Sequence, residues 1–295
     1  MNNGFKRPSK RELYKRFLFI DGNDAVNSLA GIEEGSIESV LSKFAHENSK
    51  GREGEGTLGY GPVKVRGKGG KNNLQKYEEE VLRKRTEHAA ISLLLDKLRG
   101  NDEIGVIEEY TPKVYEQVEE NELYEFKAEI RLHPLHQLVT VMQGWAETGE
   151  NFGADKKQFR ELLQLAERME RAFHGKNKAN KTLVIFAEIE GSSPEYRVAM
   201  PIKTSDLRVP LDEFTGRATF VAQVERKVGA GEKILAARIV RNSPVLPVER
   251  DAMLQMLPLF QGSSGGMDIG ITLAEEDVVL EKPAVMMKPL CIYKG

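Results

Sequence analysis

The sequence predicts an α+β protein, with a helix-rich N-terminal half that carries a Gly-rich basic insertion and an antiparallel β-rich C-terminal half. Apolar residues recur at helical spacing over residues 74–99, which predicts a long amphipathic helix. Apolar and charged residues alternate over 122–132, which predicts a strand with one face on a core and the other in water. After residue 181, strand-like segments adjoin turns with no helix between them, which argues against a doubly wound fold.

The first predicted element is a buried strand over 17–21, because an apolar run stops there at Asp21 and Gly22. A short helix through Ala30 follows, and Gly31 ends it. Further helices are predicted over 36–44, 74–99, 134–145 and 155–174.

Residues 50–73 interrupt these helices. Eight glycines and few large apolar side chains lie within 51–70. Ordering glycine costs more backbone entropy than ordering any other residue, and little apolar surface offsets that cost here. We therefore expect a flexible insertion.

The C-terminal half predicts two hairpins, a helix and a final strand. The hairpins join 182–190 with 196–202 and 218–228 with 233–240, the helix covers 248–257, and the strand covers 284–293. The segments 17–20 and 290–293 are both short and apolar, and we expect them to pair and bring the chain ends together.

The chain of 295 residues is long enough for two domains. We expect a basic tail at 1–16, an α+β region at 17–175 and a β-rich domain at 181–295. The polar residues 176–180 mark the expected boundary.

The formal net charge of −2 hides an uneven distribution. Residues 1–16 carry +5 and residues 50–73 carry +4, which leaves about −11 on the remainder. Such basic segments contact nucleic acid, an acidic protein or, less favourably, a membrane surface; otherwise they are solvated tails. The candidate anion-binding side chains of the insertion are Lys64, Arg66, Lys68 and Lys71.

The insertion does not match a phosphate-binding loop. Five residues rather than four separate Gly61 from Gly67 and Lys68, and no Ser or Thr follows. The five histidines form no set with metal-ligand spacing, and we expect neither a metal nor a cofactor.

Asp21, Asn27 and Ser28 belong to the densest polar cluster beside a predicted buried strand. Such groups bind ligands at strand ends, but they also form caps and turns, and the structural interpretation is favoured. Glu188 and Glu190 with Glu225 are either paired carboxylates or an exposed sheet surface, and the exposed surface is favoured.

Cys291 is the only cysteine, so no internal disulfide forms and a reducing compartment is indicated. No apolar window approaches the roughly 18 residues of a membrane span. We expect a cytoplasmic protein.

Residues 19–21, followed by Val26-Asn27-Ser28-Leu29, resemble the opening of a family of uncharacterised bacterial proteins of similar length. The likeness recurs at 219–225 and in the ending Lys288-Pro289-Leu290-Cys291-Ile292-Tyr293. The resemblance implies a bacterial cytosolic protein and supplies no activity or catalytic residue.

The combined prediction is a non-enzymatic binding or regulatory protein of the bacterial cytosol, whose mobile basic segments contact an anionic partner. One alternative is an enzyme of another type with a polar site near Asp21, Asn27 and Ser28. A second is a structural subunit of a larger assembly, with the exposed face of helix 74–99 as its interface. The oligomeric state is left open.

Overall fold

The computed structural model describes residues 15–32, 87–134, 181–192, 196–236 and 275–295, with a few single residues between these ranges. The predicted helices at 36–44 and 248–257, most of the one at 155–174, and the basic segments 1–14 and 50–73 lie outside the described residues. What the sequence predicts for these segments stays a prediction.

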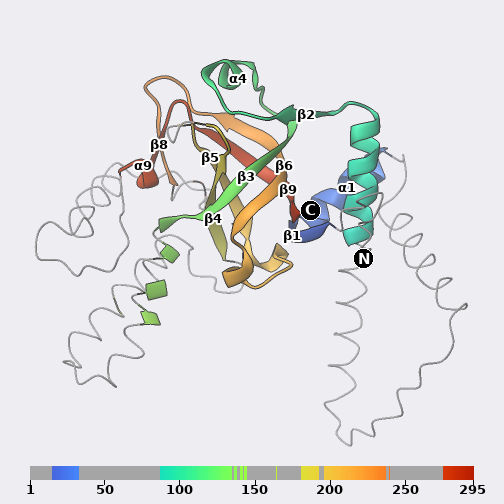
Figure 1. Cartoon of the computed structure of the whole chain (residues 1–295), viewed down its shortest axis with the longest axis horizontal. Helices are drawn as coiled ribbons and strands as arrows, with labels where there is room; N and C mark the ends of the chain where they lie inside the picture. The colour runs from blue at the N-terminus through green and yellow to red at the C-terminus, as the bar shows by residue number, and fades with distance from the viewer. Residues whose placement is uncertain are drawn as a thin grey trace, which may run out of the picture.

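Five strands close into a barrel (Figure 1). They are β3 (Leu123–Leu132), β4 (Thr182–Ile189), β5 (Val198–Lys203), β6 (Gly216–Lys227) and β9 (Val285–Lys294). β3 pairs with β4, β4 with β5, and β6 with both β3 and β9, all antiparallel. A short parallel pairing of β5 with β9 completes the circle.

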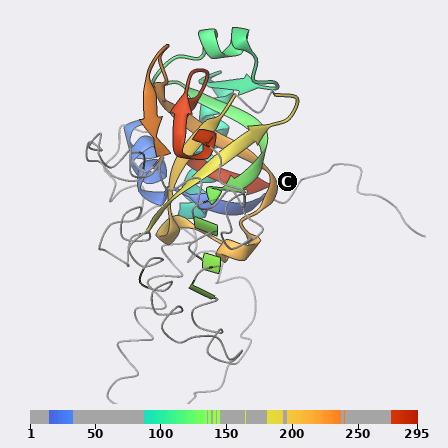
Figure 2. The same cartoon turned by 90° about the vertical axis from the view of Figure 1, so that its left-hand side faces the viewer.

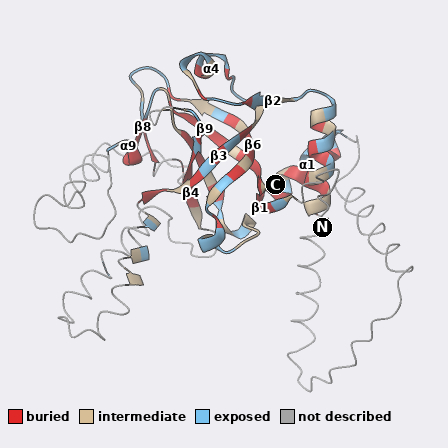
Figure 3. Cartoon of the chain, in the orientation of Figure 1, coloured by how far each residue is buried: buried red, intermediate tan, exposed pale blue. Residues whose placement is uncertain are grey.

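The alternation along β3 explains how the barrel fills. Phe126, Ala128 and Ile130 are buried inside it, whereas Lys127 and Glu129 are exposed. The side-chain period of two places the apolar set of each strand on the inner face, as predicted for 122–132. Figure 3 shows the resulting concentration of buried positions in the barrel.

Short helices lie at opposite ends of the barrel (Figure 1). At one end, α4 (Pro112–Gln117) inserts Tyr115 into the core, and the Thr111 side chain caps its first turn. At the other end are the 3-10 turns η3 (Thr204–Asp206) and η4 (Leu211–Glu213), which are followed by the buried Phe214.

The N-terminal elements lie against the outside of the barrel. β1 (Arg16–Ile20) pairs antiparallel with the end of β9, which confirms the predicted pairing of the chain ends. α1 (Gly22–Ile32) follows, and the helical residues 87–100 bury Leu94 and Leu95 in a cluster with Cys291. β2 (Ile104–Ile107) adds a parallel strand beside β3.

The predicted α+β class with a helix-rich N-terminal half is wrong, because the fold is built on a barrel of strands. The N-terminal strands β1 and β3 hydrogen-bond to C-terminal strands, so the two halves share one sheet. The helix signals at 134–145 and 155–174 fall between β3 and β4, which are neighbours in the barrel. They lengthen one connection and do not define a helical half.

One predicted hairpin is confirmed and the other is wrong. β4 and β5 form the hairpin predicted for 182–202. β6, by contrast, does not pair with β7 (Lys233–Leu235), because β3 and β9 occupy both of its edges. β7 pairs instead with β8 (Val279–Glu281), a strand the sequence did not indicate.

The barrel strands are numbered 1 to 5 here in chain order, as β3, β4, β5, β6 and β9. Around the barrel they then follow the order 1-2-3-5-4 and back to 1, and strands 3 and 5 are parallel. This is the Greek-key arrangement of the OB-fold. The connection from the first to the second strand spans 133–181, and that from the fourth to the fifth spans 228–284.

A buried ion pair joins the N-terminal elements to the barrel. Arg208 and Glu87 form the pair with side chains only 5% and 11% exposed. The Arg208 guanidinium also donates to the Ile20 carbonyl, 3.4 Å away. A buried carboxylate is stable only with such a partner.

Substitution of Gly22 by Ala should therefore destabilise the fold. A Cβ there would lie 2.4 Å from Glu87 Cδ, and Arg208 holds that carboxylate in place. Overpacking of this kind costs about 1–3 kcal/mol of unfolding free energy, measurable by urea denaturation. Gly31→Ala is the matched control, because nothing lies within 4 Å of its added Cβ. Equal stability of the two variants would contradict this packing.

Candidate functional site

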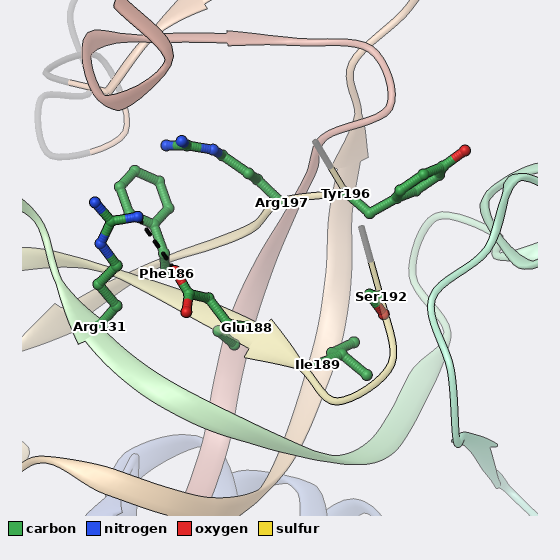
Figure 4. Close-up of a pocket in the computed structure, with 8 residues that line it drawn as sticks. Arg131, Phe186, Glu188, Ile189, Ser192, Tyr196 and Arg197 are labelled. Carbon is green, nitrogen blue, oxygen red and sulfur yellow. Dashed lines mark hydrogen bonds and ion pairs between the residues drawn. The ribbon is translucent and has the colours of Figure 1, made fainter. Parts of the chain in front are cut away.

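A pocket of about 140 Å³ lies on the outside of the barrel, where β4 ends and the chain returns into β5 (Figure 4). Arg131 of β3 and Glu188 of β4 line it from the sheet, with Phe186 beneath. Ser192, Tyr196 and Arg197 line it from the connection between β4 and β5; Ala187 and Ile189 complete the lining.

Two guanidinium groups converge beside the pocket on one carboxylate. Arg197 Nη1 donates to Asp277 Oδ1 at 2.9 Å, and Arg131 Nη2 lies 3.5 Å from the same oxygen. Asp277 belongs to the short helix α9 (Glu275–Val278), and its side chain is only 2% exposed. A carboxylate this buried is stable only when paired, so Asp277 holds both arginines in position.

A second carboxylate contacts Arg131 from the solvent side. Glu188 Oε1 accepts from Arg131 Nη1 at 3.2 Å, the contact drawn as a dashed line in Figure 4. The side chains of Arg131 and Glu188 are 40% and 56% exposed. Exposed pairs of this type contribute about 0–1 kcal/mol, so this contact breaks easily.

Aromatic rings support the arginines from below. The Arg197 guanidinium lies 5.3 Å from the centroid of the buried Phe186 ring, a cation–π contact. The His133 ring lies 5.4 Å from the same ring on another side. Burial lowers the pKa of His133 to about 4, against the opposing effect of the nearby Asp277.

Two contacts hold the rim opposite the arginines. Tyr196 extends away from Arg131 and Arg197 in Figure 4 and meets Tyr110 edge to face, with ring centroids 5.6 Å apart. The Tyr110 backbone N–H donates to Ser192 Oγ at 2.8 Å. These contacts join Ser192 and Tyr196 to Tyr110.

The chain itself covers the neighbouring outer surface of the barrel. β7 and β8, in orange and red, lie across it in Figure 2. Ile234 and Leu280 of this pair form one buried cluster with Val184 of β4 and Ala199 of β5. The pocket lies beside this cover, between the connection 190–197 and α9.

The polar cluster predicted at the end of β1 lies at the start of α1 and on its surface. Asp21 Oδ1 accepts the N–H of Asp24 at 3.1 Å and so caps α1. Asn27 and Ser28 are exposed on α1, and Asp24 forms an ion pair with Lys288. Ser28 lines a separate pocket of about 180 Å³ between α1, helix 87–100 and the barrel, whereas Asp21 and Asn27 do not.

The described residues test only some of the other candidates. Lys64, Arg66, Lys68 and Lys71 lie outside the described residues. Glu188 and Glu190 bind separate partners, Arg131 and Arg217. Among the residues that the structure describes, no group of three His, Cys, Asp or Glu side chains is arranged to hold a metal ion. In the same part of the chain, no helix is long and apolar enough to span a membrane.

Sequence reasoning missed Arg131, Arg197 and Asp277. Alternation placed Arg131 on the outer face of a predicted strand, and Arg197 lies within the predicted strand 196–202. No local pattern distinguishes the two arginines from other surface arginines, and Asp277 is 80 residues from Arg197 in the chain.

The model of the family DUF6414, a domain of unknown function, matches residues 14–293. The chain belongs to this family. The match confirms the resemblance to an uncharacterised family, while the bacterial origin of this DUF6414 protein stays a prediction. No curated protein and no solved structure matches the chain.

His133 should make the stability of this DUF6414 protein depend on pH. Its folded pKa of about 4 lies below the usual histidine value of 6.5, so the unfolded chain binds the proton more tightly. Its contribution is therefore complete above pH 6.5 and is lost as pH falls toward 4, amounting to about 2 kcal/mol between pH 7.5 and pH 5. Urea unfolding of the wild type and His133→Leu at both pH values measures this difference. An equal pH dependence in the two proteins would exclude His133 as its source.

Proposed function

We propose that this protein binds single-stranded nucleic acid at the pocket formed by Arg131, Arg197 and Tyr196. The observation that carries the proposal is the convergence of two arginines, Arg131 of β3 and Arg197 immediately before β5, on the outer face of an OB-type barrel. The nucleic acid is one of the anionic partners that the charge pattern of the sequence predicts.

The pocket has the chemistry for a phosphate and a base. A guanidinium presents five N–H donors in a planar fork that suits phosphate oxygens. Arg131 is held by carboxylates yet remains 40% exposed to an incoming group. Tyr196 supplies a half-buried aromatic side chain on the opposite rim, and aromatic faces stack on bases of any sequence.

The position of the pocket supports the same ligand by analogy of fold. OB-folds bind oligonucleotides on the second and third strands, flanked by the connections between strands one and two and between four and five. The pocket adjoins β4 and β5, which hold those places here. His133 begins the first connection and Asp277 belongs to the other.

The proposal also includes the sequence-based predictions about the basic segments, the compartment and the absence of enzymatic activity. The basic segments 1–16 and 50–73 would add contacts to the phosphate backbone without regard to sequence, since their charge is available to any polyanion. We place the protein in the bacterial cytosol, without enzymatic activity of its own. The buried, unpaired thiol of Cys291, whose pKa burial raises, fits a reducing compartment.

Arg197→Gln should weaken binding of a fluorescein-labelled single-stranded oligonucleotide, measured by fluorescence anisotropy. Loss of one arginine–phosphate contact should raise Kd about 5- to 100-fold, since a charged hydrogen bond contributes about 1–3 kcal/mol. Arg226→Gln is the matched control, because this partly exposed arginine of β6 pairs with Glu232 and lies neither in the pocket nor in the basic segments.

Four probes distinguish the partner classes: single-stranded DNA, single-stranded RNA, duplex DNA and an acidic peptide. Anionic vesicles provide a fifth. Binding of the peptide or the vesicles alone, or equal losses for Arg197→Gln and Arg226→Gln, would reject the proposed function.

A second test addresses the insertion. Replacing Lys64, Arg66, Lys68 and Lys71 together by Gln should weaken binding for every oligonucleotide sequence alike. Each lost phosphate contact on a single strand lowers the slope of log Kd against log salt by about 0.7. A titration from 50 to 200 mM salt measures this slope, and an unchanged slope would show that the insertion makes no phosphate contact.

A further inference from the structure

We propose that Glu188 is the specificity-determining residue of this pocket, an exposed carboxylate that keeps free anions off Arg131 until a polyanion displaces it. The inference rests on the proposed function and adds a selection step to it. It follows from the unequal burial of the two carboxylates that share the arginines.

The charges of the pocket balance when no ligand is bound. Arg131 and Arg197 supply two positive charges, and Asp277 and Glu188 supply two negative ones. A phosphate that approaches Arg131 therefore meets a neutral cluster with a carboxylate in front. Withdrawal of one carboxylate would leave a net positive charge for the phosphate.

Burial decides which carboxylate withdraws. Asp277 is 2% exposed and contacts both arginines, so its removal would leave buried groups unpaired. Glu188 is 56% exposed, contacts Arg131, and reaches solvent by rotating its own side chain. Asp277 is accordingly the positioning residue, and Glu188 is the group that a ligand phosphate replaces.

The strand register places Glu188 for this role. Glu188 lies opposite Glu129 and Arg131 opposite Phe186, so Glu188 and Arg131 are diagonal neighbours on the outer face. Long side chains reach across such a diagonal. The Glu188 carboxylate and the Arg131 guanidinium meet at the dashed contact in Figure 4.

A carboxylate attached beside Arg131 favours ligands that bind at several points over ligands that bind at one. Glu188 is tethered beside Arg131 and competes at a high local concentration, which a free monovalent or divalent anion at millimolar concentration does not match. A nucleic acid strand already held at Arg197 and Tyr196 presents its phosphate at a comparable local concentration. The pocket should therefore accept a strand and reject inorganic phosphate.

Glu188→Gln tests the inference directly, with Glu190→Gln as the matched control. Glu190 is two residues further along, is exposed and pairs with Arg217, but it does not line the pocket. In the oligonucleotide titration, Glu188→Gln should lower Kd three- to tenfold, and Glu190→Gln should change it less than twofold. Inorganic phosphate at constant ionic strength should compete with the oligonucleotide at least threefold more effectively on Glu188→Gln than on wild type.

Asp277→Asn should change Kd in the opposite direction to Glu188→Gln. It should raise Kd at least threefold, because the arginines lose the carboxylate that positions them. Its circular dichroism spectrum and urea midpoint show whether the variant folds, and if it does not, the Glu188→Gln result decides alone.

The outcomes separate the two proposals. Suppose that Arg197→Gln weakens binding, but Glu188→Gln behaves like Glu190→Gln or binds more weakly. The role of Glu188 as specificity-determining residue is then rejected, and the proposed function stands. If the wild type binds no oligonucleotide, the proposed function itself is rejected. Tighter binding by a folded Asp277→Asn would overturn the assignment of the two carboxylates.

Discussion

The structure depends on the pairing of β9 along both of its edges. β6 occupies one edge over most of its length, while β5 and then β1 share the other. This last strand closes the barrel, and closure removes the edges that an open sheet would expose to other chains. It also sets the spacing of β3, β4 and β5, which carry or adjoin Arg131, Glu188 and Arg197.

The pocket combines one fixed and one movable carboxylate on a rigid support. Asp277 reaches the arginines from the long connection 228–284, whose β7 and β8 are anchored on β4 and β5 by an apolar cluster. The apolar contact keeps α9 beside the barrel, and the buried ion pairs orient the guanidinium groups. Hydrophobic burial thus holds a charged site in register, while the exposed Glu188 remains free to exchange partners with solvent.

Local patterns predicted several elements well and the class of the fold poorly. Alternation identified β3, an apolar run identified β1, and the turn at residues 191–194 identified the hairpin of β4 and β5. Helix signals in the connection between β3 and β4 were counted as a helical half, because sequence does not show that two separated strands are neighbours. The false pairing of β6 with β7 has the same origin, since adjacency along the chain was taken for adjacency in the sheet.

By itself, the sequence determined which faces of its strands are apolar, where β1 and β9 begin and end within a residue or two, and how charge divides between tails and body. Only the tertiary structure decided which strand edges meet, and hence that residues 131, 188, 197 and 277 share one pocket. The physical reason is the distance along the chain over which each interaction acts. Burial and turn preferences act between near neighbours in the chain, whereas sheet closure and a buried ion pair join groups many residues apart.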